Sequence, residues 1–430
     1  MSPRCIVTAE TDSSDTGRPA SGWRARLALL GNPNFRRLWA AGLIYGTVRW
    51  LEVLAVAVFV FDSTGSPFIV SLMLVVRMLP MILLGGLIGV LAEKINRRQL
   101  LLVTFGGNAM SCAVLSLLVF TNHIELWHLG LGAFLNGVIW SADYAARRTL
   151  LGEIAGNENV GVAMSLDSAT TNVTRMLGPL LGGVIYSTIG LQGTYLVGLF
   201  LFSIAIYLIG AMTYRPGPAL VGGSKFFADF REGLRYIRSN RTITMVLMVT
   251  VVLNFFGFPF VSMVPVIGNQ ELGLNPVYIG VLASAEGGGA FFGAILAALF
   301  VQPMHYRRLF VYGSTVFLCA ILIFAFSSGF TFSFIALLIC GFGVAGFSTM
   351  QGTIMYLEAP PEMRGRILGV LAFCIGASPI GLLNAGWLAE WLGPSQAIAV
   401  LAGGGLVAMA LVCFYWRDVW SLRGRERIFG

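Results

Sequence analysis

Charged residues are scarce in this chain: Asp, Glu, Lys and Arg make up only 11% of its 430 residues, where a soluble domain has about 25%. Hydrophobic residues make up 57%, and the mean hydropathy is +0.80. Too few charges are available to cover a water-soluble surface of this size. A soluble enzyme or soluble binding domain is therefore excluded, and we expect the chain to fold in a lipid bilayer.

Cysteine and histidine are also few, with six and three residues respectively. The sequence has no Cys-x-x-Cys pair, and the three histidines form no metal-ligand cluster. It also lacks a Walker loop, a dinucleotide fingerprint and a nucleophile elbow, the motifs that mark nucleotide-driven pumps and many enzymes. We therefore expect no metal site, no cofactor and no enzymatic activity.

Long apolar runs take up most of the chain, each about 20 residues or more, the length that a helix needs to cross a bilayer. The period-two alternation of a transmembrane β-barrel is absent. Because lipid offers no hydrogen bonds, the backbone of such runs must be helical. The sequence predicts an all-α integral membrane protein with twelve transmembrane helices, at residues 36–61, 68–92, 100–121, 126–146, 159–186, 190–214, 242–267, 276–301, 308–328, 330–357, 364–388 and 393–416.

The basic residues that give the formal net charge of +8 lie mainly in the connections between spans and at the chain ends. All but three of the 28 basic residues lie near the chain ends or in every second connection between the expected spans. Cytoplasmic loops accumulate Lys and Arg. The pattern predicts a protein of the cytoplasmic (inner) membrane with both termini in the cytoplasm, and it argues against nucleic acid as a partner.

The chain divides at its one long interior connection. We expect a disordered cytoplasmic tail at 1–33, a six-helix bundle at 34–214, a cytoplasmic central loop at 215–241, a second six-helix bundle at 242–416 and a cytoplasmic tail at 417–430. Within the central loop, the stretch KFFADFREGLRYIRSN repeats apolar residues at helical spacing between charged ones. This pattern predicts an amphipathic helix on the inner leaflet.

The loop GVLAEKINRR interrupts two apolar runs with a glycine, an acid and several bases. It resembles the signature loop between the second and third helices of the major facilitator superfamily. That pattern maps onto Gly89, Glu93, Lys94, Asn96, Arg97 and Arg98. Asn stands where the family prefers Gly, and Glu where Asp is commoner. A basic inside loop alone would explain the arginines but not the glycine or the acid. The resemblance implies two pseudo-symmetric six-helix bundles around a central cavity.

A second stretch, NVTRMLGPLLGG, resembles the motif associated with proton-driven exporters of this superfamily. The residues that match are Gly178, Pro179, Gly182 and Gly183. The proline kinks the helix and the glycines allow a neighbour to approach closely. Thr174 stands where the full motif has a further glycine. The alternative is a kinked, tightly packed helix that has no bearing on the direction of transport.

The resemblance extends over nearly the whole chain. NPNFRRLW, DFREGLRYIRSN and PPEMRGRILG are similar to segments of the branch that contains the enterobactin exporter and the macrolide efflux pumps. One departure is the basic Arg49 before Trp50, where that branch often has an acid. The resemblance implies efflux, and it leaves the substrate open.

Ionisable residues inside the apolar runs are the candidates for proton coupling or substrate binding, because each costs about 2.5–3.5 kcal/mol or more unless it is paired or faces water. Five lie near the middle of their spans and two nearer the cytoplasmic ends. They are Arg49, Glu52, Arg77, Arg175 and Glu286, and then Asp143 and Asp167. Arg49 and Glu52 are three residues apart, share a helical face and could pair.

Glu286 differs from the other candidates because the spans of its own half contain no basic residue beyond those at their ends. A buried carboxylate without a cation favours its neutral form and readily takes up a proton. This property suits a proton carrier. The alternatives are a neutral Glu286 hydrogen-bonded within the packing, or a bridge to an arginine of the first half.

We also expect a gate at the signature loop. Glu93 would bond Arg97 and the start of the span at 364–388, near Arg364 and Arg366, and so stabilise the outward-facing state. The favoured function is proton-coupled efflux of a small organic molecule, such as a siderophore or a drug, by a monomer surrounded by membrane lipids. The alternatives are an uptake permease, a translocator of lysolipids or metabolites, and a receptor or scaffold that does not transport.

Overall fold

The computed structural model describes residues 29–213, 226–360 and 363–417. Within these ranges every regular element is helical and there is no strand. The first half contains α2 (Pro33–Thr64), α3 (Pro67–Lys94), α4 (Arg97–Phe120) and α5 (Leu126–Gly210). The second half contains α6 (Phe226–Ser239), α7 (Arg241–Val252), α8 (Phe260–Gln270), α9 (Pro276–Phe300), α10 (Tyr306–Ala325), α11 (Phe330–Glu358), α12 (Arg364–Ile375), α13 (Ser378–Leu392) and α14 (Pro394–Tyr415).

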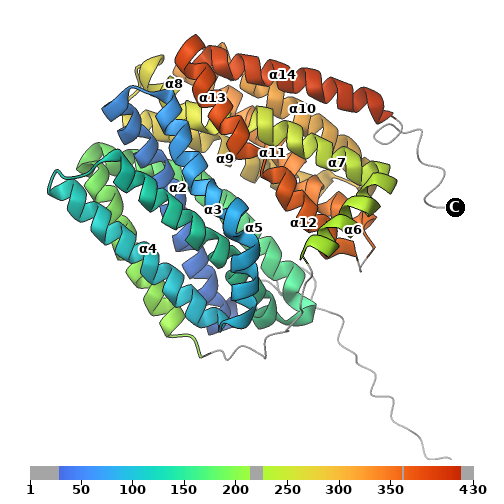
Figure 1. Cartoon of the computed structure of the whole chain (residues 1–430), viewed down its shortest axis with the longest axis horizontal. Helices are drawn as coiled ribbons and strands as arrows, with labels where there is room; N and C mark the ends of the chain where they lie inside the picture. The colour runs from blue at the N-terminus through green and yellow to red at the C-terminus, as the bar shows by residue number, and fades with distance from the viewer. Residues whose placement is uncertain (1–28, 214–225, 361–362, 418–430) are drawn as a thin grey trace, which may run out of the picture.

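The two halves form two groups of helices, each with its own apolar core. The blue-to-green helices α2–α5 lie together, and the yellow-to-red helices α7–α14 lie beside them (Figure 1). Phe35 and Phe105 are fully buried in the core of the first half, as are Phe310 and Phe317 in the second. The expected all-α membrane fold is confirmed.

Ten helices of the described residues are long and apolar enough to cross a membrane. One of these candidate spans, Glu158–Gly210, runs for 53 residues, about twice the usual length. The figure of twelve spans therefore stays a prediction.

The helix α5 is broken at two glycines. Gly156 has φ 72° and Gly190 has φ 77°, so neither continues the helix. Positive φ is readily adopted only by glycine. The breaks divide α5 into three rods, at 126–155, 157–189 and 191–210, which correspond to three of the expected spans.

Two further expected spans are bent in the middle. Between α7 and α8 the chain forms a π-helical turn, Leu253–Gly257, just before Pro259. Between α12 and α13 the helix stops at Gly376, shortly before Pro379. Proline lacks the N–H that would continue the hydrogen-bond ladder, so each bend has a local cause.

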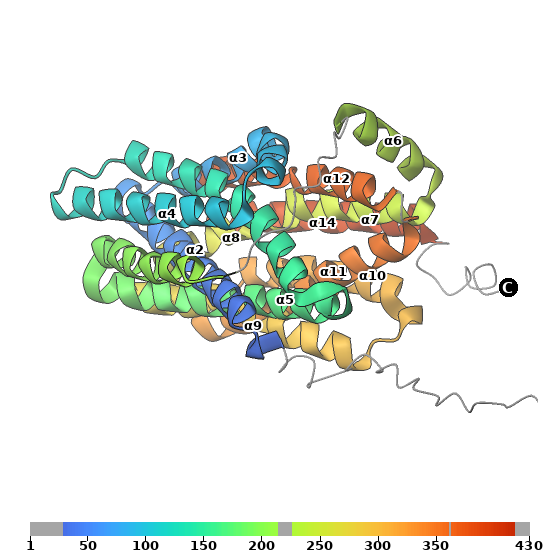
Figure 2. The ribbon, with the colours of Figure 1, turned by 90° about the horizontal axis from the view of Figure 1, so that it is seen from below.

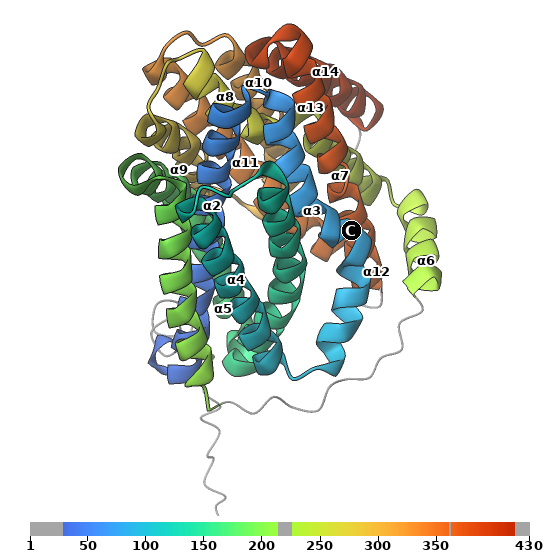
Figure 3. The same ribbon diagram turned by 60° about the vertical axis from the view of Figure 1, so that its left-hand side comes forward.

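The helix α6 stands apart from the bundles and lies beside α12 (Figures 2 and 3). Its Glu232 pairs with Arg366 at 2.6 Å. Ile237 is buried, whereas Leu234 remains 37% exposed. The central stretch is therefore helical over Phe226–Ser239, and its position on a leaflet stays a prediction.

One end of the first half gathers basic side chains and helix ends. Arg37 Nη1 donates to the carbonyl of Ala211 at 2.5 Å, and Arg98 Nε donates to that of Ile209 at 3.1 Å. These bonds bring together the starts of α2 and α4 and the end of α5. We call this the basic end.

The opposite end joins the two halves. Asn269 Nδ2 donates to Asp62 Oδ1 at 2.8 Å. The backbone N–H of Phe68 donates to Glu390 Oε1 at 3.3 Å, and the hydroxyl of Ser66 donates to the same oxygen. Each bond links the end of α2 or the start of α3 to the second half. We call this the closed end.

Candidate transport site between the halves

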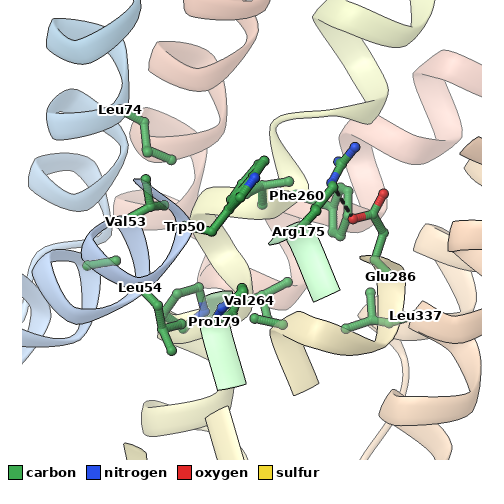
Figure 4. Close-up of a pocket in the computed structure, with 14 residues that line it drawn as sticks. Trp50, Val53, Leu54, Leu74, Arg175, Pro179, Phe260, Val264, Glu286 and Leu337 are labelled. Carbon is green, nitrogen blue, oxygen red and sulfur yellow. Dashed lines mark ion pairs between the residues drawn. The ribbon is translucent and has the colours of Figure 1, made fainter. Parts of the chain in front are cut away.

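A cavity lies where the two halves meet, with about 560 Å³ of empty space that includes open solvent. Trp50 of α2 and Leu74 of α3 line it from the first half, and Phe260 of α8 and Leu337 of α11 from the second (Figure 4). Most of its walls are apolar or aromatic. The charged side chains among its lining residues are an arginine and a glutamate.

That charged pair connects the two halves. Arg175 Nε of α5 lies 2.8 Å from Glu286 Oε2 of α9, as the dashed line in Figure 4 marks. The Glu286 side chain is only 6% exposed, and its Oε1 has no hydrogen-bond partner among the described residues. Among the alternatives given for Glu286, the structure shows the salt bridge to an arginine of the first half. The expectation of an unpaired carboxylate was wrong.

Close contact between α5 and α9 makes this pair possible. A Cβ on Gly287 would lie 2.7 Å from the backbone of Arg175, and one on Gly280 would lie 2.6 Å from the carbonyl oxygen of Pro179. A Cβ on Gly183 would overlap the carbonyl oxygen of Pro276. Only glycine lets the two backbones approach this closely.

The other two glycines of the exporter-like motif face α2. A Cβ on Gly178 would overlap Trp50, and one on Gly182 would lie 2.7 Å from the carbonyl oxygen of Leu51. The stretch with Pro179 therefore packs α5 tightly against α2 on one side and α9 on the other. Close packing is a finding; its bearing on transport direction stays a hypothesis.

A second buried ionic group lies entirely in the first half. Arg77 Nη1 of α3 lies 3.4 Å from Glu52 Oε2 of α2. Asn136 Nδ2 of α5 donates to the same oxygen at 3.0 Å, and Arg77 Nη2 donates to Asn136 Oδ1 at 3.4 Å. Sequence reasoning missed Asn136; the available signal was one amide within an apolar run.

Arg49 does not pair with Glu52, so that expectation was wrong. Its guanidinium lies over the ring of Trp140 at 3.9 Å and within 5.6 Å of Trp50. Glu52 instead takes Arg77, which comes from the neighbouring helix. The shared helical face allowed the local pair, but the two side chains reach partners on different helices.

Asp143 and Asp167 belong to an ionic cluster of α5 towards the basic end. Arg147 Nε lies 3.2 Å from Asp143 Oδ2, and Arg148 Nε lies 3.0 Å from Asp167 Oδ2. Arg147 also pairs with Asp167. Both carboxylates are buried and paired with arginines. Neither residue is among those that line the central cavity.

The signature loop is described in part. Gly89, Glu93 and Lys94 fall in the last turns of α3, and their side chains lie outside the described residues. The Asn96 side chain accepts from the N–H of Arg98 at 3.0 Å and so caps α4.

The basic partners of the expected gate are engaged within their own halves. Arg97 pairs with Glu153 of α5. Arg364 lies 3.7 Å over the ring of Tyr356, and Arg366 bonds α6. The bond from Glu93 to Arg97 and α12 stays a prediction.

Two helical halves joined around a central cavity, with an ion pair crossing between them, define a membrane transporter of the major facilitator class. The chain belongs to the transmembrane secretion effector family, whose sequence profile matches residues 24–421. The proteins of this family are transporters rather than enzymes, and the chain is a multi-pass membrane protein with a small-molecule substrate.

Known proteins resemble the chain over nearly its whole length. The macrolide efflux protein A of Streptococcus pyogenes is 21% identical over 395 residues, covering 88% of this chain and 95% of that protein. The enterobactin exporter of Salmonella choleraesuis is 24% identical over 406 residues, covering 91% and 94%. A bacterial homologue of the human lysosomal transporter Spinster has the same fold, with a TM-score of 0.72 at 15% identity, covering 91% of this chain and 99% of that one.

Proposed function

We propose that this chain exports a small organic molecule in exchange for protons, by alternating access of its central cavity. Relatives named for the efflux of macrolides and the export of enterobactin support the direction. The cavity has the largely apolar lining, with a few charged groups, of a site for a small organic molecule. We further propose a monomer in a bacterial inner membrane, with both termini and the basic end in the cytoplasm.

The observation that carries the proposal is the ion pair between Arg175 and Glu286. It links α5 to α9, and it lies in the wall of the cavity. When the closed end is open, Glu286 would be separated from Arg175 and its carboxylate would take up a proton from the outside. After the halves come together again, release of that proton to the cytoplasm would restore the pair. Substrate bound from the cytoplasm would then open the closed end once more.

The other features predicted from the sequence would contribute to the conformational change or to proton binding. The bundles at 34–214 and 242–416 would move as two units. The glycines of the α5 motif would set their contact, and the signature loop would join the halves at the basic end when the closed end opens. Glu52 is the reserve site for the proton, since it is also buried and also paired with an arginine.

The test compares two matched variants in proteoliposomes with an imposed pH gradient, using erythromycin and enterobactin as probes. Glu286→Gln should lower gradient-driven accumulation by about tenfold or more and leave counterflow exchange intact, because exchange needs only the cavity and the conformational switch. Glu52→Gln removes a similarly buried, arginine-paired carboxylate that does not cross between the halves, and it should keep the coupling.

Four results would contradict the proposal in different ways. Loss of coupling in Glu52→Gln alone would move the proton site to α2. Full coupling in both variants would remove proton exchange and favour a passive or sodium-driven carrier. A wild-type protein that moves the probes inward under the same gradient would be an uptake permease, and one that moves no solute would be a receptor or scaffold.

A further inference from the structure

Arginines and aromatic rings alternate along one side of the first half, from the cavity towards the basic end. They come from α2 and from two rods of α5. We call this set the cation–aromatic ladder, and its members are Arg175, Trp50, Arg49, Trp140, Tyr144 and Arg148.

The inner part of the ladder lies at the cavity. Trp50, which lines the cavity, has Arg175 at 5.4 Å on its ring and Arg49 at 5.6 Å. Arg49 lies still closer to the ring of Trp140, at 3.9 Å. All these distances fall within the range at which a cation is attracted to an aromatic face.

The outer part continues towards the basic end. The rings of Trp140 and Tyr144 are 6.5 Å apart, edge to face. Arg148 lies 4.4 Å over the ring of Tyr144, and its Nη1 donates to the hydroxyl of that tyrosine at 2.5 Å. The ladder therefore runs from mid-depth of the bundle to the level of the ionic cluster of α5.

The ladder faces the interior side of α5. Ala133, Trp140 and Tyr144 are spaced by seven and four residues, so they share one face of the helix. Ala133 lines a second, smaller cavity beside the first. Leu131 and Leu135 are 51% and 43% exposed. At 100° per residue, both point to the side of the helix roughly opposite to this face. The apolar leucines therefore occupy the lipid side, and the 47% exposure of Tyr144 is on the inner side.

Arg49 is the member of the ladder that lacks a counter-ion. Arg77, Arg147, Arg148 and Arg175 of the first half each have a carboxylate within ion-pair distance, whereas Arg49 has none among the described residues. An uncompensated cation at mid-membrane is costly, and a ring face offsets only part of that cost. A ligand that brings a negative charge would compensate it.

We infer that the ladder binds a small aromatic organic anion as the transported substrate. Its carboxylate or other acidic group would accept hydrogen bonds from the fork of Arg49, and its ring would pack against Trp140 or Trp50. A cationic ligand would meet Arg49 and Arg175 at the same rings and would be repelled. The inference names the substrate class and rests on the proposed transport function.

The test is equilibrium binding to the purified full chain in nanodiscs, with no pH gradient. The probes are 1-naphthoate, the neutral 1-naphthalenemethanol and the cationic 1-naphthylmethylamine, which share one ring system. Wild type should bind 1-naphthoate roughly tenfold to a hundredfold more tightly than the alcohol, and the amine least. Arg49→Gln should abolish this preference without weakening the alcohol, and Arg49→Lys should keep part of it.

Two further variants serve as controls for the binding experiment. Trp140→Leu should weaken all three probes, since the ring contact is shared. Arg241→Gln removes an arginine that lies 5.8 Å over Tyr415 in the second half, away from the ladder, and should change nothing. Unchanged affinity for the alcohol reports that Arg49→Gln is still folded, and the wild-type preference can be read without any variant.

Any one of four results would overturn the inference. Wild type could bind the three probes equally, bind the amine most tightly, or fail to bind 1-naphthoate. The Arg49→Gln variant could also keep the preference for the anion. These failures differ from a failure of the proposed function. A chain that exports the cationic probe but neither binds nor moves 1-naphthoate refutes the substrate class alone. A chain that prefers 1-naphthoate but moves no solute in proteoliposomes refutes transport alone.

Discussion

If the protein works by the proposed alternating access, the contact of α5 with α9 should make the equilibrium between its two access states sensitive to a single methyl group. In Gly280→Ala, the added Cβ would lie 2.6 Å from the carbonyl oxygen of Pro179 and 3.2 Å from Cα of Gly183. Each of these atoms is backbone of the other half. No rotamer change can relieve the overlap, so the helices themselves must separate.

The energetic cost of Gly280→Ala follows from how closely the added Cβ would approach the neighbouring backbone. An ordinary contact begins at 3.4 Å and the Cβ would lie at 2.6 Å, so the backbones must separate by about 0.8 Å. Overpacking of this kind costs about 1–3 kcal/mol. The cost falls only on the state in which the halves touch at this place. The state that is open at the closed end should therefore gain population by about 5-fold to 150-fold.

The assay is a distance measurement by double electron–electron resonance. Spin labels are placed on cysteines introduced at Ser63 and Trp391, which are exposed at the closed end on opposite halves, in a background without native cysteines. Gly280→Ala should add a population at longer distance. The matched control is Gly343→Ala, whose Cβ would lie 2.6 Å from the backbone nitrogen of Phe317 within the second half. It should lower the melting temperature and leave the distance distribution unchanged.

The reasoning fails if Gly280→Ala keeps the wild-type distance distribution and transport rate while remaining folded. That result would mean that the contact relaxes locally and does not oppose separation of the halves. A longer-distance population in Gly343→Ala as well would show that loss of packing in either half opens the closed end, and the link to the junction would be lost.

Two further predictions concern topology and stability. A cysteine at Gly65 should react with an impermeant thiol reagent from outside the cell, and one at Ser239 should not; the reverse pattern would invert the proposed orientation. Arg77→Gln leaves Glu52 buried without its cation and should lower the stability of the first half by about 3 kcal/mol, seen as a lower melting temperature in detergent, with partial recovery when Glu52→Gln is added. An unchanged melting temperature would mean that Glu52 is neutral in the native protein.

Much of the fold could be predicted because bilayer constraints are local. A run of apolar residues must be helical and long enough to cross, whatever its neighbours are. The breaks of α5 at Gly156 and Gly190 lie at or between the expected spans, but only the structure shows which of the 53 glycines take a positive φ. The family resemblance rested on the same kind of local motif, and the family match confirmed it.

The partners of the buried charges could not be predicted in this way. The sequence favoured a local pair of Arg49 with Glu52, and it left the partner of Glu286 open. In the structure each of these carboxylates is bound by an arginine on another helix: Arg77 for Glu52, and Arg175 of the opposite half for Glu286. Most of the spanning helices are apolar on nearly every face, so their sequences do not fix how each is rotated about its axis. Packing of small residues against neighbouring backbones sets that rotation, and only the tertiary structure therefore decided which charges meet.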